Sequence, residues 1–175
     1  MVSMEAQNGR DTLPSSGWVR SPLKLLAAIV VCNLAGIIGA LVTTTGEGSW
    51  YAAIEKPPFN PPGFVFGPVW TTLYILMGIS LYLVWIEGTG RRDVRLALTV
   101  FFIQLGLNTL WTFLFFGLQS PFLGLVEILI LWIFILATIV VFYPINKAAA
   151  FLLVPYLAWV TFAAFLTCSI WILNG

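Results

Sequence analysis

The stretch WYAAIEKPPFNPPGFVFGPVW, residues 50–70, joins two long apolar runs and decides how the fold is interpreted. Proline fixes φ and removes a backbone donor, so most of this stretch is not expected to be helix or central strand. Its five prolines are Pro57, Pro58, Pro61, Pro62 and Pro68. Its aromatic side chains are Trp50, Tyr51, Phe59, Phe64, Phe66 and Trp70. A stiff aromatic segment of this kind predicts an ordered lid at one mouth of a membrane bundle.

Composition limits the class of protein. The 175 residues are 60% hydrophobic and only 9% charged, and a soluble domain of this size cannot bury so much apolar surface. The net charge of +1 gives no reason to expect a nucleic-acid partner. Histidine is absent, which removes the usual general base and the commonest metal ligand. Cys32 and Cys168 lie in apolar runs without metal-site spacing, so neither a metal nor a cofactor is expected.

Five apolar runs each approach the ~20 residues that a bilayer requires. They cover residues 23–43, 66–86, 94–116, 122–142 and 148–173. Strands are excluded because open sheet edges cannot face hydrocarbon. The predicted fold is therefore an all-α integral membrane bundle of five helices over residues 22–175. Residues 1–21 form a polar arm that is expected to be disordered.

The basic residues predict the orientation of the bundle. With five spans, Arg10, Arg20, Lys24, Arg91, Arg92, Arg95 and Lys147 fall on one side, and the other side holds only Lys56. The positive-inside rule then places the N-terminus and basic loops inside, and the aromatic first loop and the C-terminus outside.

Polar and aromatic residues recur at helical spacing within the spans. Gln104, Asn108, Trp111 and Phe115 are separated by four, three and four residues and share one face of the third span. Buried amides need partners, so this face should look into the bundle. Similar stripes begin at Trp70 in the second span and at Tyr156 in the fifth, and Glu127 is the only acidic residue well inside a span. One lidded cavity lined by these groups fits all four patterns.

Many short motifs occur in order along the chain, and they include Trp50-Tyr51, Lys56-Pro57, Pro61-Pro62, Gly67-Pro68-Val69-Trp70, Leu107-Asn108, Phe115-Phe116-Gly117 and Pro155-Tyr156-Leu157-Ala158-Trp159. With these motifs the sequence resembles the TspO/MBR family of translocator proteins, tryptophan-rich sensory proteins and peripheral benzodiazepine receptors. The resemblance extends from about Ala35 to Asn174. It implies a five-helix bundle, commonly a homodimer, that binds porphyrins, sterols, and isoquinoline or benzodiazepine ligands beneath the first loop.

Spacing and resemblance together give the candidate ligand-binding residues. They are Trp50, Tyr51, Pro61, Trp70, Tyr74, Gln104, Asn108, Trp111, Phe115, Glu127, Tyr156, Trp159 and Ala163. The sequence departs from the family pattern in the loop, where Phe59 replaces a frequent Trp, and in the last span, where Thr167 replaces a frequent Asn. The segment 166–174 also lacks the Tyr and basic residue of the proposed cholesterol motif, so no sterol recognition is predicted there.

Structural roles compete with these functional interpretations. Trp and Tyr near helix ends often anchor a span at the membrane interface. Gln104 and Asn108 could simply bridge helices. Glu127 is either a proton-relay or ligand group or a structural residue stabilised near a helix N-terminus. The small-residue steps Ala35/Gly39 and Gly36/Ala40 favour helix packing within the subunit over a dimer interface.

The leading functional hypothesis is a membrane receptor or carrier for porphyrins, haem included, and other flat hydrophobic ligands, acting in sensing, transport or scavenging. An alternative is an enzyme that degrades porphyrins with light or oxygen through Trp70 and Trp159. Nothing in the spacing resembles a hydrolytic triad, a metal site or a nucleotide loop. A third hypothesis is a transporter of tetrapyrroles or lipids. The single intramembrane acid and the lack of repeats argue against ion coupling.

Overall fold

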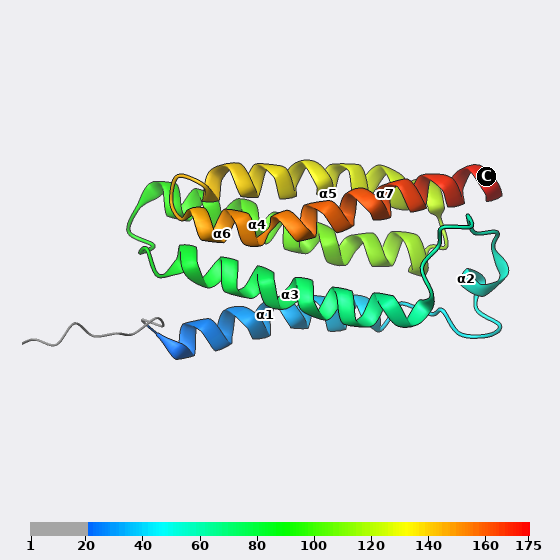
Figure 1. The fold of residues 1–175 in the computed structure, drawn as a ribbon, viewed down its shortest axis with the longest axis horizontal. Helices are drawn as coiled ribbons and strands as arrows, with labels where there is room; N and C mark the ends of the chain where they lie inside the picture. The colour runs from blue at the N-terminus through cyan, green and yellow to red at the C-terminus, as the bar shows by residue number, and fades with distance from the viewer. Residues whose placement is uncertain (1–20) are drawn as a thin grey trace, which may run out of the picture.

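The computed structural model describes residues 21–175, in which every regular element is helical and no strand occurs (Figure 1). The elements are α1 (Pro22–Ala40), α2 (Trp50–Ala53), α3 (Gly63–Trp85), α4 (Arg92–Thr112), the π-helical turn η1 (Phe113–Gly117), α5 (Pro121–Phe142), α6 (Lys147–Leu152) and α7 (Val154–Asn174). The expected disordered arm, residues 1–21, lies outside the described residues except for Ser21.

Within residues 21–175, five helical segments are long and apolar enough to cross a bilayer. They are Pro22–Ala40, Gly63–Trp85, Arg92–Gly117, Pro121–Phe142 and Lys147–Asn174. Each one overlaps a predicted span and differs from it by a few residues at its ends. The prediction of an all-α, five-span integral membrane bundle is confirmed.

The prediction that most of residues 50–70 are not helical is wrong. Trp50–Ala53 form α2, and α3 begins at Gly63, so more than half of the stretch is helix. Pro68 lies in the second turn of α3, beyond the unpaired donors of the first turn, so it removes one helix bond, the one to the carbonyl of Phe64. The helix nevertheless continues through it to Trp85. The prolines at 57, 58, 61 and 62 do remain outside helices, as φ restriction predicts.

The fifth span is two helices. Pro155 cannot donate to the carbonyl of Phe151, and α6 gives way to α7 at Leu153. The small residues Ala149 and Ala150 are buried, and Ser80 Oγ in α3 donates to the carbonyl oxygen of Ala149 at 2.7 Å. This contact holds α6 against α3.

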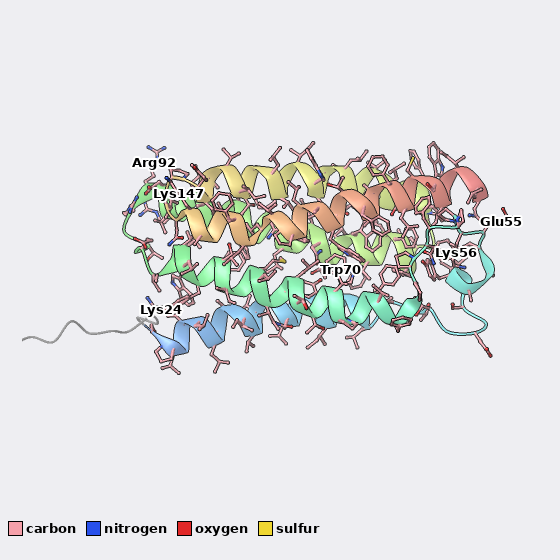
Figure 2. All side chains as sticks on the ribbon, viewed as in Figure 1. Lys24, Glu55, Lys56, Trp70, Arg92 and Lys147 are labelled. Carbon is pink, nitrogen blue, oxygen red and sulfur yellow. The ribbon has the colours of Figure 1, made fainter. Side chains whose placement is uncertain are left out.

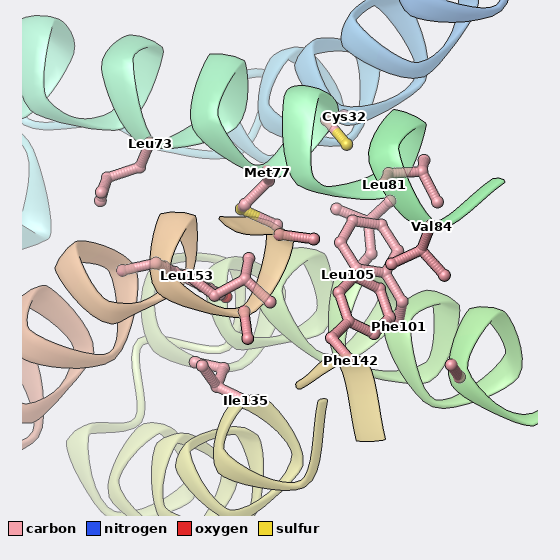
Figure 3. Packing of buried hydrophobic residues seen from close by; sticks show 14 of the residues in the cluster. Cys32, Leu73, Met77, Leu81, Val84, Phe101, Leu105, Ile135, Phe142 and Leu153 are labelled. Carbon is pink, nitrogen blue, oxygen red and sulfur yellow. The ribbon is translucent and has the colours of Figure 1, made fainter. Parts of the chain in front are cut away.

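The helices enclose a solid core at one end and diverge at the other. α1 packs on α3 and α4, α4 on α5, and α5 on α7, while α6 rather than α7 packs on α3. α7 consequently moves away from α3 toward the C-terminus (Figure 1). In the closed half, Phe101 and Phe142 stack with ring centroids 5.8 Å apart, and Met77 and Ile135 are fully buried in the same hydrophobic cluster (Figure 3). The core therefore occupies the half of the bundle that lies away from the aromatic loop.

Charge marks the two ends of the bundle. Lys24, Arg92 and Lys147 gather at the closed end, whereas Glu55 and Lys56 lie at the loop end (Figure 2). Arg10 and Arg20 are outside the described residues. The uneven distribution is as the sequence predicts, and the assignment of the two ends to inside and outside stays a prediction.

Glycines allow close helix contacts within the subunit. A Cβ built on Gly36 would lie 2.3 Å from the Tyr74 ring, and one on Gly39 would lie 2.9 Å from Thr112 Oγ1. The small-residue steps of α1 therefore face α3 and α4 of the same chain. Gly78 of α3 leaves less room for adjustment, because its Cβ would lie 2.6 Å from the backbone Cα of Ile29 and not from a side chain.

Replacing Gly78 with Ala should separate α1 from α3, because backbone cannot move aside as a flexible side chain can. We expect the Gly78→Ala variant to lose about 1–3 kcal/mol of unfolding free energy, the usual cost of overpacking. Thermal or denaturant unfolding in detergent measures this loss. Gly106→Ala is the control, because nothing lies within 4 Å of its Cβ position. Equal stability of the two variants would contradict the close α1–α3 contact.

Candidate functional site

A cavity of about 490 Å³ lies where α3 and α7 diverge, beneath the aromatic loop. This volume falls within the ~300–1,000 Å³ that is typical of small-molecule sites. Its lining comes from the end of α1, the loop, the first turns of α3, the end of α4 with η1, and α7, whereas α5 contributes no lining residue. On the side away from the aromatic loop, the cavity ends where the solid core begins.

A chain of hydrogen bonds forms the floor. The hydroxyl of Tyr74 in α3 donates to Asn108 Oδ1 in α4 at 2.5 Å, and Asn108 Nδ2 donates to the hydroxyl of Tyr156 in α7 at 3.0 Å. Asn108 is 3% exposed and Tyr156 is fully buried, so these polar groups are satisfied inside an apolar bundle. One amide thus joins three spans at a single level.

Two walls of the cavity are stacked aromatic pairs. On α3, Trp70 stacks on Tyr74 with centroids 5.6 Å apart and planes inclined at 28°. On α4 and η1, Trp111 stacks on Phe115 at 5.0 Å and 13°. Trp111 Nε1 donates to the carbonyl of Gly124 in α5 at 3.1 Å, which fixes the ring against rotation. Both walls present ring surface held by contacts behind it.

The third wall is Trp159 on α7. Its ring meets Phe66 of α3 edge-on, with centroids 6.0 Å apart, and this pair closes the gap between the diverging helices. Trp159 Nε1 is buried and finds no acceptor within residues 21–175. A buried donor without a partner in the protein is a group that a polar atom of a ligand or water would satisfy.

The roof of the cavity is a short segment that we call the lid, residues 49–62. Trp50 and Tyr51 contact Phe115 edge-on at 5.6 and 6.3 Å. The Tyr51 hydroxyl donates to Asn60 Oδ1 at 3.0 Å, which closes the lid on itself. Burial raises the pKa of Tyr51 above its ordinary value, so the phenol remains a neutral donor near neutral pH.

Lys56 is the single charged residue among those that line the cavity. Its Nζ lies 4.9 Å from the centroid of the Tyr51 ring and donates to the carbonyl oxygens of Ala52 and Ile54. The ammonium is therefore held at the mouth of the cavity, with its charge balanced only by carbonyl dipoles and the ring.

The π-helical turn η1 was not predicted from the sequence. Leu118 N donates to the carbonyl of Phe113 at 2.8 Å, a bond over five residues that widens the end of α4. As a result, Phe115 and its neighbour Phe116 both line the cavity. A Cβ on Gly124 would lie 2.8 Å from the Phe115 ring, so a glycine on α5 makes room for the turn.

The structure brings most of the candidate residues together. Nine of them line the cavity, namely Tyr51, Pro61, Trp70, Tyr74, Asn108, Trp111, Phe115, Trp159 and Ala163. Four do not line it, namely Trp50, Gln104, Glu127 and Tyr156.

The four other candidates lie behind the lining. Trp50 packs on Phe115, and Tyr156 supports Asn108. Gln104 is fully buried one turn below Asn108, within the solid half of the bundle. Glu127 is 4% exposed on α5. The side-chain polar atoms of Gln104 and Glu127 have no hydrogen-bond partner among the described residues.

Some lining residues were absent from the candidate list. Phe66 lies four residues before Trp70, so extending that stripe by one turn would have found it. Thr112 lies four residues after Asn108 and next to Trp111, so only a wider stripe on the third span would have included it. Lys56 and Asn60 had no periodic signal, because they are brought to the cavity by the fold of the lid. Residues 21–175 contain no group of His, Cys, Asp and Glu side chains that could hold a metal ion.

Comparison with known proteins agrees with this architecture. A model of the TspO/MBR family matches residues 28–172. The chain is 49% identical over 153 residues to the tryptophan-rich protein TspO of Archaeoglobus fulgidus, covering 87% of this chain and 98% of that protein. It is 42% identical over 128 residues to the human translocator protein, covering 72% and 76%. It is 36% identical over 139 residues to the tryptophan-rich sensory protein of Cereibacter sphaeroides, covering 79% and 83%.

The floor of the cavity should be sensitive to the loss of one amide. Asn108→Ala leaves the buried hydroxyls of Tyr74 and Tyr156 without their partner, so we expect about 1–3 kcal/mol of lost unfolding free energy. Unfolding in detergent measures the change. Asn33→Ala is the control, because Asn33 Nδ2 bonds only to the carbonyl of Ile29 in its own helix. An Asn108→Ala variant as stable as Asn33→Ala would argue against the three-helix junction.

Proposed function

Because the chain belongs to the TspO/MBR family, we propose that it is a membrane receptor or carrier whose cavity binds porphyrins and other flat hydrophobic ligands. The observation that carries this proposal is the enclosed aromatic cavity beneath the lid, bounded below by the Tyr74–Asn108–Tyr156 chain. The names of the relatives, translocator protein and tryptophan-rich sensory protein, are consistent with a role in transport or sensing.

The shape and chemistry of the lining favour a planar ligand. The ring surfaces of Trp70, Trp111 and Trp159 come from three different helices and border one space. Aromatic contacts add ~0.5–1.5 kcal/mol each beyond the burial of apolar area, so several rings together favour a broad π-system. The indole N–H of Trp159 and the hydroxyls of Thr112 and Thr167 provide a few polar groups that would orient the ligand's edge.

The charge at the mouth narrows the proposal to ligands that carry an acidic group. Lys56 is the sole cationic side chain among the lining residues, and no acidic side chain lines the cavity beside it. A porphyrin that inserts its macrocycle among the rings would leave its carboxylates near the lid. A Lys56–carboxylate pair would replace the carbonyl contacts that Lys56 Nζ makes in the closed lid.

The membrane context completes the proposal. The apolar flanks of the bundle place the cavity within reach of ligands dissolved in the bilayer. From the positive-inside rule we place the lid and C-terminus outside and the basic end inside. The family resemblance also supports a homodimer.

The three cavity tryptophans should determine affinity. We expect Trp70→Ala and Trp159→Ala each to weaken protoporphyrin IX binding tenfold or more, since losing a large buried ring costs ~1.5–3 kcal/mol and tenfold is ~1.4 kcal/mol. Quenching of tryptophan fluorescence or the porphyrin absorbance shift measures binding in nanodiscs. Trp85→Ala is the matched control, because Trp85 lies at the opposite end of α3. Unchanged affinity in both cavity variants would contradict the proposed site.

The same titration discriminates binding from degradation. If the protein is a receptor or carrier, porphyrin absorbance persists in light and air at one equivalent per site. Loss of absorbance over many equivalents, abolished by Trp70→Ala or Trp159→Ala, would instead support the enzymatic hypothesis.

Lys56 should distinguish acidic from neutral ligands. We expect Lys56→Ala to weaken protoporphyrin IX binding about two- to fivefold, in the range of ~0.5–1 kcal/mol for one partly exposed charged contact. The dimethyl ester of the same porphyrin lacks the carboxylates and should bind wild type and Lys56→Ala equally. Equal losses for the acid and the ester would show that Lys56 acts through the structure of the lid and not through charge.

A further inference from the structure

The lid is held in shape mainly by bonds within itself. Ser49 Oγ accepts from Ala52 N at the start of α2, Tyr51 bonds Asn60 across the lid, and Lys56 Nζ caps carbonyls of the same segment. The prolines at 57, 58, 61 and 62 restrict the backbone between these bonds. The lid can therefore move as one body without losing its own fold.

Among the described residues, a single side chain hydrogen-bonds the lid to the bundle. Asn174, at the end of α7, donates through Nδ2 to the carbonyl of Glu55 at 2.9 Å and accepts through Oδ1 from Glu55 N at 2.9 Å. The same Nδ2 also donates to the carbonyl of Ile170 at 2.8 Å, which orients the amide. One primary amide thus pairs with both backbone groups of one lid residue, as a neighbouring strand would.

The other attachments of the lid are apolar contacts, mostly between rings but including Ile54, and its direct continuation into α3 at Pro62. Trp50 and Tyr51 meet Phe115, and Phe59 meets Phe162 of α7 with centroids 6.4 Å apart. Such contacts are weakly directional and permit sliding. The chain enters the lid from α1 through Gly46, which has open space around it, and Gly48, which has a φ of +79° that glycine adopts without strain. A flexible backbone segment therefore precedes a rigid lid. The hydrogen bonds that join the lid to the bundle lie away from this segment, at Glu55.

We propose that Asn174 is the latch of this lid and controls how fast ligands enter and leave the cavity. Release of the Glu55 backbone would let the lid turn about its two chain connections, residues 46–48 and the start of α3 at Pro62-Gly63, and expose the aromatic cavity. Asn174 does not line the cavity, so it acts by positioning the lid and not by touching ligand. The kinetic consequence rests on the proposed function, whereas the release of Glu55 does not.

The test combines binding kinetics with amide exchange in nanodiscs. We expect Asn174→Ala to raise the association and dissociation rates of protoporphyrin IX about tenfold each, corresponding to ~1.4 kcal/mol in the closed lid. The equilibrium affinity should change by less than about threefold. The substitution removes the same Asn174–Glu55 hydrogen bonds from the ligand-free and the ligand-bound protein. Hydrogen–deuterium exchange should show faster exchange at residues 54–56. Ser169→Ala is the matched control, since Ser169 Oγ on the same helix bonds only to the carbonyl of Phe165.

The outcomes separate the latch from the proposed function. Unchanged rates and unchanged exchange at residues 54–56 in Asn174→Ala would overturn the latch. A loss of affinity with an unchanged association rate would also overturn it. Failure of wild type to bind porphyrin would refute the proposed function, while amide exchange would still test the release of Glu55. If Asn174→Ala does not fold, Asn174→Asp keeps the acceptor for Glu55 N but places a carboxylate oxygen against the carbonyls of Glu55 and Ile170, and should raise the rates and the exchange in the same direction.

Discussion

The hydrogen-bond chain from Tyr74 through Asn108 to Tyr156 is the constraint on which the rest of the structure depends. Polar groups inside a membrane bundle are stable only when they find partners, and here one amide satisfies hydroxyls from two other helices. The chain therefore fixes the register of α3, α4 and α7 at one level. Below that level, large aliphatic and aromatic side chains fill the bundle; above it, the helices are free to diverge around a cavity.

The divergence has its own physical origin in α6 and α7. Pro155 interrupts the last span, so the small residues of α6 pack closely on α3 while α7 leans away. Where the helices diverge, wide aromatic rings replace interlocking aliphatic side chains. Rings that stack in pairs or meet edge to face can wall a space without filling it, which a core of Leu and Ile could not do.

The lid solves a problem that the cavity creates. An aromatic cavity open to water would expose a large apolar surface, and one sealed by helix packing would admit no ligand. A proline-stiffened segment with internal hydrogen bonds covers the rings and keeps its own fold. It is attached to the bundle by apolar contacts and by one side-chain amide. Under the proposed function, that attachment would let the lid close stably and still open for a flat hydrophobic ligand.

The amino-acid sequence by itself determined the class of the protein, the number of spans and the helix faces that look inward. Those features follow from local rules, because bilayer thickness sets the length of a span and helical periodicity aligns Asn108 with Trp111. Only the tertiary structure decided that Gln104 and Glu127 lie outside the cavity while Lys56 and Asn60 line it. It also decided that α3 continues through Pro68 and that α4 ends in a π turn. The reason is physical: depth along a bundle, and the folding of a loop over it, depend on contacts between residues far apart in sequence, such as Glu55 with Asn174.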